Sequence, residues 1–293
     1  MNLMKWRWLY FLISGVVIVP GLISLALFGL RPGIDFTGGS LLEVQLQASS
    51  SATIAPQVVA QTTQPTFAFD SVTSSGPQEF LLRGKTMAND QKNQVMNQLG
   101  HLGAVKEVRF ETVGPTLGKE LMWKTFYALL VVCAIITWFV ARQFKELKFG
   151  VCAILAMLHD SLVLVGVFSL LGHFAGVEVD VLFVTALLTT LSFSVHDTIV
   201  VYDRIRELSR KHARVSFLDL TNAAVLETMG RSLNNSLTII FMLAALVLLG
   251  GESIRWFAVA LLVGAITGTY SSTFTAVPLL IVWDDVKARF QKK

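Results

Sequence analysis

The sequence is poor in charged residues. Only 15% of its 293 residues are Asp, Glu, Lys or Arg, whereas 53% are hydrophobic. A soluble globular domain carries about a quarter charged residues. The charges that are present gather into short clusters between long uncharged stretches. This composition excludes an ordinary soluble domain and is typical of a polytopic α-helical membrane protein.

Cysteine and catalytic motifs are also scarce. Cys133 and Cys152 each lie within an apolar stretch, and a disulfide framework or metal site needs more ligands at closer spacing. The sequence contains no Walker A motif, no G-x-S-x-G, no H-E-x-x-H and no phosphate-binding loop. We therefore expect no enzyme, no metal and no cofactor. Energy for any transport must then come from an ion gradient or from a partner.

Six segments are long and apolar enough to cross about 30 Å of hydrocarbon. They are 9–30, 124–141, 149–171, 179–202, 232–250 and 255–282. The first segment is longer than the apolar region of a usual signal peptide, and no cleavage site of small residues precedes Arg31. We therefore interpret it as a membrane anchor.

The basic residues predict the orientation. They lie before the first span, between the second and third, between the fourth and fifth, and after the sixth, whereas the turn 172–180 has no Lys or Arg. Because Lys and Arg mark cytoplasmic loops, we expect both termini and loops 142–148 and 203–231 in the cytoplasm. The same rule explains the net charge of +4, so we expect a lipid bilayer and no nucleic acid as partner.

The segment 31–123, expected outside the membrane, reads as a small α+β domain. Its predicted strands are 40–47, 65–72, 78–84 and 104–114, and its predicted helices are 51–63 and 89–103, the latter with Asn89 as N-cap. The order βαββαβ is the ferredoxin-like pattern. The predicted organisation is therefore a first transmembrane helix (1–30), this extracytoplasmic domain (31–123) and a five-helix transmembrane domain (124–293).

Glycines mark the exit from the first span, RPGIDFTGGSLLEV (31–44). Gly33, Gly38 and Gly39 permit backbone dihedrals that other residues disfavour. A Gly-Gly pair is no phosphate loop without the Lys-Ser/Thr that follows in such loops. From the residues alone, the segment is a chain reversal from helix into strand.

Ionisable side chains lie inside the spans, where each costs about 2.5–3.5 kcal/mol. His159 and Asp160 lie in the third span and His196 and Asp197 in the fourth, while Arg231 begins the fifth. Polar residues follow Arg231 within two turns: Asn234, Asn235, Ser236 and Thr238. Such groups act either as contacts between helices or as parts of an ion path, and for His159 and Asp160 both interpretations stay open.

Asp197 and Arg231 are the predicted proton relay. Both lie near the cytoplasmic side, so they form an ion pair if their helices face each other. A pair that separates and rejoins gives Asp197 two protonation states, and the group can then take a proton from one side and release it to the other. The neighbouring polar residues, with His159 and Asp160, would support this relay by holding waters or bonding between helices.

Three stretches together resemble the SecD/SecF family of bacterial protein-export membrane proteins, within the resistance-nodulation-division (RND) superfamily. They are GIDFTGGS (33–40), EVDVLFVTALLTTLSFSVHDTIVVYDRIRE (178–207) and TMGRSLNNSLT (228–238). The six spans and the large outer loop after the first strengthen the resemblance. The single small outer domain is similar to that of the family's shorter branch, whose members pair with SecD.

The resemblance implies more than the residues alone. The chain would be half of an RND-type twelve-span bundle in the bacterial plasma (inner) membrane, acting with SecD and the SecYEG channel on translocating polypeptides and driven by the proton-motive force. Asp197 and Arg231 match the family's relay residues, and Gly33, Asp35, Gly38 and Gly39 match its hinge motif. His196 departs from the family pattern, where Asn is familiar.

Two other functions stay open. The chain could be half of an RND-type exporter of lipids or small molecules, although its outer segment is small for that role. It could also be a non-transporting scaffold whose charges only hold it to a partner. The coupling ion, proton or sodium, is open as well.

Overall fold

The membrane-spanning helices dominate the computed structural model, which describes residues 2–48, 54–76, 78–144, 146–212 and 214–291. Within these residues, six helical stretches are long and apolar enough to cross a membrane, which confirms the predicted spans. They are α1 (Arg7–Phe28), α5 (Pro115–Gln143), α6 (Leu147–Ala175), α7 (Val181–Lys211), α8 (Phe217–Leu249) and the pair α9 (Glu252–Phe274) and α10 (Ala276–Gln291). A 3-10 helix, η1 (Leu3–Trp6), precedes α1.

The helices continue well beyond the apolar segments. Most of the segment 203–231 is helical, because α7 runs to Lys211 and α8 begins at Phe217. Ser216 caps α8 by accepting a hydrogen bond from the Asp219 N–H, with N and Oγ 3.2 Å apart. Hydropathy marks only the part of a helix that crosses hydrocarbon, whereas backbone hydrogen bonds carry the helix onward into water.

The sixth span is broken into two helices. α9 ends at Phe274, Thr275 has a φ of −121°, and α10 begins at Ala276. Pro278 lies four residues after Phe274, so it has no N–H for the Phe274 carbonyl and its ring crowds that group. The proline therefore accounts for the break.

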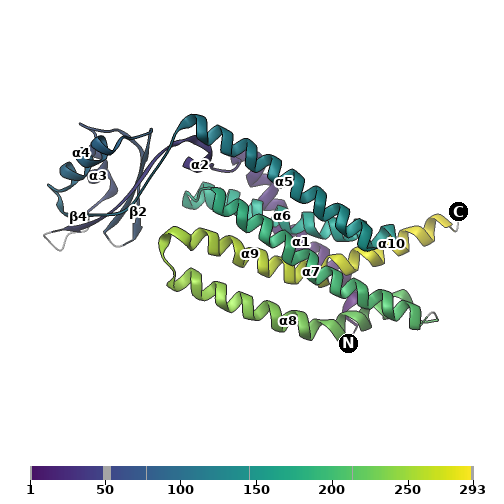
Figure 1. Cartoon of the computed structure of the whole chain (residues 1–293). Helices are drawn as coiled ribbons and strands as arrows, with labels where there is room; N and C mark the ends of the chain where they lie inside the picture. The colour runs from purple at the N-terminus through teal and green to yellow at the C-terminus, as the bar shows by residue number, and fades with distance from the viewer. Residues whose placement is uncertain (1, 49–53, 77, 145, 213, 292–293) are drawn as a thin grey trace. The chain divides into compact units, whose positions relative to one another are not determined.

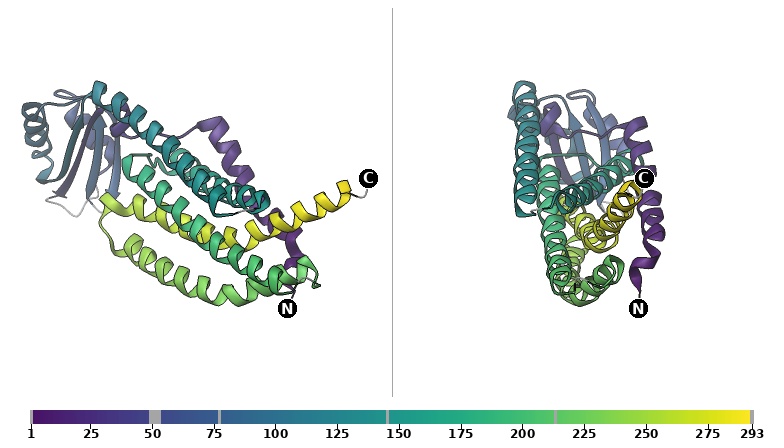
Figure 2. Two further views of the ribbon diagram at one scale, coloured as in Figure 1. Left: turned by 45° about the vertical axis from the view of Figure 1, so that its right-hand side comes forward. Right: turned by 90° about the vertical axis from the view of Figure 1, so that its right-hand side faces the viewer.

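The chain divides into two compact units, described here separately. The membrane unit comprises Met1–Arg31 and Ala128–Lys293, and the sheet unit comprises Pro32–Tyr127. In the membrane unit, α6, α7, α8 and α9 run side by side (Figure 2). Its buried core includes Phe149 of α6, Tyr202 of α7 and Leu280 of α10.

Helices α1 and α6 are parallel and packed in register. Several of their contacts join residues 145 positions apart: Ser14 with His159, Gly21 with Gly166, Ser24 with Ser169, and Phe28 with His173. Ser14, Gly21 and Ser24 are also the buried residues of α1. A Cβ atom on Gly21 would lie 2.9 Å from the Gly166 Cα, so only glycine permits this approach.

Helices α7 and α9 are parallel as well. Two contacts join residues 74 positions apart, Thr190 with Gly264 and Ser194 with Gly268. The same offset continues to Tyr202, whose hydroxyl donates at 2.8 Å to the carbonyl of Ala276, the first residue of α10. α9 is thus fixed against α7 along its length.

The sheet unit has the predicted βαββαβ order. It contains α2 (Ile34–Thr37), β1 (Gly39–Ala48), α3 (Pro56–Thr63), β2 (Phe69–Gly76), β3 (Glu79–Gly84), α4 (Asn89–Leu99) and β4 (Gly103–Val113). All pairings are antiparallel in the order β2-β3-β1-β4, and α3 and α4 cover one face (Figure 1). Leu42, Val44, Phe80, Val95 and Leu99 form the core between sheet and helices.

Three local predictions in the sheet unit need correction. Asn89 is not the N-cap of α4: the cap is Ala88, whose N–H donates to the Gln91 side chain at 3.0 Å, so a residue inside the helix satisfies the cap. β2 begins at Phe69 rather than 65, because Thr66 and Phe67 still bond back to the Thr63 carbonyl. The predicted helix 51–63 begins at Pro56, and residues 51–53 lie outside the described residues.

Candidate functional site

Asp197 lies at the meeting point of α7, α8 and α9. Its Oδ2 accepts a hydrogen bond from Ser232 Oγ of α8 at 2.7 Å. A small cavity of about 30 Å³ adjoins the carboxylate, and this volume holds about two water molecules. The cavity is lined by Phe193, His196 and Asp197 of α7, Asn235, Ser236 and Ile239 of α8, and Ala265, Gly268 and Thr269 of α9. We call it the Asp197 pocket.

Arg231 does not pair with Asp197 within the described residues. Ser232, the next residue, contacts Asp197 instead, and successive residues of a helix point about 100° apart. Arg231 is exposed and lines a second, more open pocket. Its other lining residues are Val200, Asp203, Arg204, Glu207, Glu227 and Thr228. The predicted partners of the relay, Asp197 and Arg231, thus face different pockets.

An ion-pair network joins α7 and α8 beside Arg231. Arg204 of α7 pairs with Glu207 of its own helix and with Glu227 of α8. Lys211 also pairs with Glu207, at 2.7 Å. These exposed pairs contribute little stability individually, but they hold the polar ends of the two helices together.

The other polar residues of the fifth-span motif divide between two environments. Asn235 and the buried Ser236 line the Asp197 pocket with His196. Asn234 is exposed, and its carbonyl accepts a hydrogen bond from the Thr238 hydroxyl at 2.9 Å, within α8. Asn234 therefore does not contribute to the pocket.

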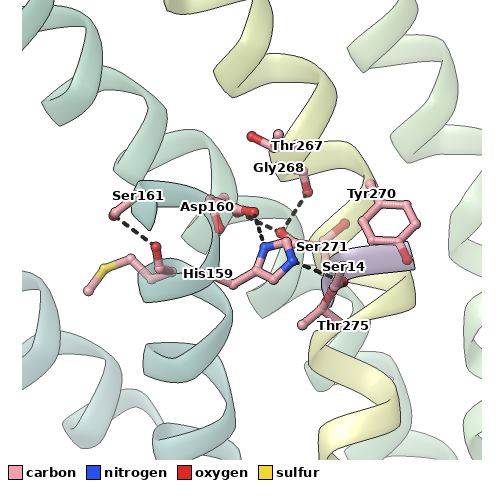
Figure 3. Close-up of polar contacts among 12 residues, drawn as sticks. Ser14, His159, Asp160, Ser161, Thr267, Gly268, Tyr270, Ser271 and Thr275 are labelled. Atoms are coloured by element: carbon pink, nitrogen blue, oxygen red, sulfur yellow. Dashed lines mark hydrogen bonds and ion pairs between the residues drawn. The ribbon is translucent and has the colours of Figure 1, made fainter. Parts of the chain in front are cut away.

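His159 and Asp160 form a separate buried network (Figure 3). His159 Nδ1 lies 3.0 Å from Asp160 Oδ1, and His159 Nε2 lies 3.0 Å from Ser14 Oγ of α1. Ser271 Oγ of α9 donates to Asp160 Oδ2 at 2.6 Å. Asp160 is 4% exposed and His159 9%. Neither residue lines the Asp197 pocket, so the structure does not place them beside Asp197.

The Gly-Gly segment turns the chain into β1. Gly38 has φ 74° and Gly39 has φ 129°, values that favour glycine. A Cβ atom on Gly38 would lie 2.7 Å from the Pro115 Cα, and one on Gly39 would lie 2.7 Å from the Gly84 carbonyl oxygen. The exit from the first span and the start of α5 are therefore packed together within the sheet unit.

Gly33 and Asp35 have less demanding positions. Gly33 is extended, with φ −75°, and precedes the short helix α2. Asp35 lies in the first turn of α2, where a carboxylate stabilises the helix N-terminus. Neither position needs a left-handed backbone.

The sequence interpretation missed the hydroxyl groups that bond the two carboxylates. Ser232 bonds Asp197, Ser271 bonds Asp160, and Ser14 bonds His159. Serine is common in membrane spans, and no spacing rule identifies which serine faces a carboxylate on another helix. Ser232 alone had a signal, since it lies inside the motif TMGRSLNNSLT.

The fold and these sites define a multi-pass membrane protein with polar groups between its helices and a ferredoxin-like sheet unit. The family model described as "Protein export membrane protein SecD/SecF, C-terminal" matches residues 92–286, and the SecD/SecF GG motif matches residues 23–49. The chain belongs to the SecD/SecF family.

Curated relatives agree over almost the whole chain. A protein translocase subunit SecF from Thermobaculum terrenum is 40% identical, covering 97% of this chain and 94% of the relative. The SecF subunit from Anaerolinea thermophila is 41% identical over the same shares. A SecDF protein from Bacillus subtilis is 33% identical, and the chain covers 38% of its length.

Solved structures of SecDF proteins share the fold. The crystal structure of SecDF from Thermus thermophilus has a TM-score of 0.86 and 29% identity over 97% of this chain. SecDF in a super-membrane-facing form has a TM-score of 0.72 and 27% identity. This chain spans 39% and 40% of those two chains, so it corresponds to part of a longer protein in each case.

Proposed function

We propose that this protein is an accessory subunit of the Sec protein translocation machinery that acts with SecD and uses the proton-motive force. Family membership and the SecF relatives support the Sec role. Fusion of the two halves in SecDF relatives supports association with SecD. The observation that carries the proton coupling is Asp197, an intramembrane carboxylate that accepts a hydrogen bond from Ser232 and adjoins a small cavity.

Asp197 is the proposed proton carrier. A carboxylate accepts the Ser232 hydrogen bond, whereas a protonated Asp197 can donate a hydrogen bond in turn, so the contact between α7 and α8 changes with the proton. The cavity beside it has room for water, which conducts protons between hydrogen-bonded groups. Protonation at this point would therefore alter how two helices pack.

Arg231 is the proposed counter-charge. It lies one residue from Ser232, so a rotation of α8 by about 100° about its axis would exchange the serine for the arginine opposite Asp197. In that arrangement the guanidinium would stabilise the ionised carboxylate. The arrangement with Ser232 opposite Asp197 then corresponds to the state in which the arginine has withdrawn.

The proposed orientation follows the basic clusters. Both termini and the Arg231 pocket would face the cytoplasm of a bacterial inner membrane, and the sheet unit would lie outside. There it would act on polypeptides emerging from SecYEG. α5 is only 6% buried within the described residues, so it is free to contact lipid or the SecD half.

Proton flux into vesicles that contain this chain and its partner tests the proposal. We expect Asp197→Asn to abolish flux and gradient-dependent export while assembly with the partner is retained. The matched control is Asp285→Asn, because Asp285 is an exposed carboxylate paired with Arg7. The control should leave flux unchanged.

Two outcomes contradict the proposal. Unchanged flux and unchanged export in Asp197→Asn would favour a non-transporting scaffold. Flux that depends on Asp197 but export that does not would favour an RND-type exporter of lipids or small molecules. Flux that follows a sodium gradient would keep the relay and change the coupling ion.

A further inference from the structure

The His159–Asp160 network joins three helices through buried polar contacts. His159 and Asp160 belong to α6, Ser14 to α1 and Ser271 to α9. Ser14 Oγ also lies 3.4 Å from the hydroxyl of Thr275, at the break between α9 and α10. All five side chains are buried, and Figure 3 shows them converging between the helices. The network is therefore a closed polar site within the membrane unit.

Charge balance makes this site sensitive to protons. Asp160 and His159 are each other's ion-pair partner within the described residues. With a neutral imidazole and an ionised carboxylate, the pair carries one negative charge. One further proton, on either side chain, makes the pair neutral overall. Loss of the proton leaves one negative charge in a site that is 4% exposed at Asp160. A buried charge without compensation is unfavourable, so the network couples proton binding to packing.

We propose that His159 and Asp160, together with Ser14 and Ser271, form a second proton-binding site, distinct from the Asp197 pocket, that controls how α1 is held against α6 and α9. Its place in transport rests on the proton coupling proposed above. Proton binding at the site itself is an equilibrium property and is measured independently of flux.

The contact with α1 gives the site its mechanical effect. Ser14 can donate to a neutral His159 nitrogen, but it must accept when both ring nitrogens carry protons. Gain or loss of a proton therefore reverses or breaks the hydrogen bond between Ser14 and His159, which joins the middle of α1 to α6. The same helix pair is joined further along by Ser24 and Ser169, whose Oγ atoms are 2.9 Å apart. α1 leads through Arg31 into the Gly-Gly segment.

The second site and the Asp197 pocket meet at one turn of α9. Gly268 lines the Asp197 pocket, and its carbonyl lies 3.3 Å from Ser271 Oγ as an alternative acceptor for the hydroxyl proton that Ser271 donates to Asp160. Ser194 of α7 packs against Gly268, and its buried Oγ has no hydrogen-bond partner within the described residues.

No other ionisable group on the helices packed against α6 replaces the His159–Asp160 pair within the described residues. The hydroxyls of Tyr10 on α1 and Tyr270 on α9 donate to backbone carbonyls, although the Tyr270 ring lies 6.5 Å from the His159 ring. The carboxylates and histidine of α7 and α10 bond or face elsewhere. His196 and Asp197 line the Asp197 pocket, Asp203 pairs with Arg206, Glu207 pairs with Arg204 and Lys211, Asp284 pairs with Lys148, and Asp285 pairs with Arg7.

Infrared difference spectra between about pH 5 and pH 8, where histidine normally titrates, test proton binding. The sample is this chain with its partner in lipid nanodiscs. We expect imidazole and carboxyl signals that disappear in His159→Asn and Asp160→Asn and persist in Asp197→Asn. His196→Gln is the matched histidine control and should remove a different signal. Because the wild-type spectrum with labelled histidine carries the main result, a variant that fails to fold does not prevent the test.

Disulfide formation between Ser24→Cys and Ser169→Cys tests the effect on α1, with Cys133 and Cys152 replaced by alanine. We expect the cross-linking rate to change with pH more steeply when Asp160 is present than in Asp160→Asn, where only thiol ionisation remains.

Three outcomes decide between the alternatives. Absence of any His159 or Asp160 signal over this pH range would overturn the inference and leave a fixed contact between helices. Equal pH dependence of cross-linking with and without Asp160 would overturn the control of α1. A His159–Asp160 signal that persists while Asp197→Asn leaves flux unchanged would support the second site and contradict the relay proposed for Asp197.

Discussion

The same dipeptide, His-Asp, occurs in two neighbouring spans with different surroundings. In α6, His159 and Asp160 bond each other and are closed off by serines from two other helices. In α7, His196 is exposed and Asp197 accepts a hydrogen bond from Ser232 beside a cavity. The comparison shows that the sequence of an intramembrane motif identifies its chemistry, whereas the neighbouring helices determine whether that chemistry is enclosed or accessible.

Removing each carboxylate tests this difference most strongly. We expect Asp160→Leu to lower the free energy of unfolding by about 3 kcal/mol or more, because it breaks a buried, fully bonded pair. Asp197→Leu should lower it by about 1 kcal/mol, because one hydrogen bond is lost at a half-buried position. Unfolding in mixed detergent micelles measures both. Equal losses would contradict the distinction between an enclosed and an accessible site.

The approach of α1 to α6 provides a second test. We expect Gly21→Val to destabilise the membrane unit by about 1–3 kcal/mol, because the side chain would overlap the Gly166 backbone and displace Ser14 from His159. Gly15→Val is the matched control on the same helix, since nothing lies within 4 Å of a Cβ atom there. The unfolding transition of each variant is the measurement. If Gly15→Val were as unstable as Gly21→Val, the loss of stability could not be assigned to the close contact between α1 and α6.

The two serines that bond the carboxylates give the smallest and most specific effect. Hydrogen bonds between membrane helices contribute about 0.6 kcal/mol on average, so Ser232→Ala and Ser271→Ala should both fold. We expect Ser271→Ala to be the less stable, because Ser271 is fully buried, and Ser232→Ala to alter flux more. Ser161→Ala is the control, because Ser161 bonds the Met157 carbonyl of its own helix. The reverse result, with Ser232→Ala the less stable and Ser271→Ala altering flux more, would exchange the roles of the Asp197 pocket and the His159–Asp160 network.

Much of the fold could be predicted because it depends on local patterns. Six spans follow from the length of apolar segments, and the order βαββαβ follows from alternation in strands and spacing in helices. The ends of the helices were predicted poorly. α7 and α8 continue into the segment 203–231, where polar residues carry no hydropathy signal although the backbone hydrogen bonds persist.

The candidate site could be predicted only in part. Of the expected supporting residues, His196, Asn235 and Ser236 line one cavity with Asp197, whereas Asn234, His159 and Asp160 do not. Arg231 was expected to pair with Asp197, but the rotation of α8 places Ser232 there in this structure. A rotation of a helix about its axis depends on every contact along its length, and no local motif reports it.

The sequence by itself determined the number of spans, the strand and helix order of the sheet unit, and the presence of ionisable groups within the membrane, because each depends on residues that are neighbours in the chain. Only the tertiary structure decided which serine meets which carboxylate, the offsets that align α1 with α6 and α7 with α9, and the separation of the two His-Asp pairs. These features depend on the close approach of neighbouring helices at Gly21 and Gly264, where the absence of a side chain on one helix matters only once another helix lies against it.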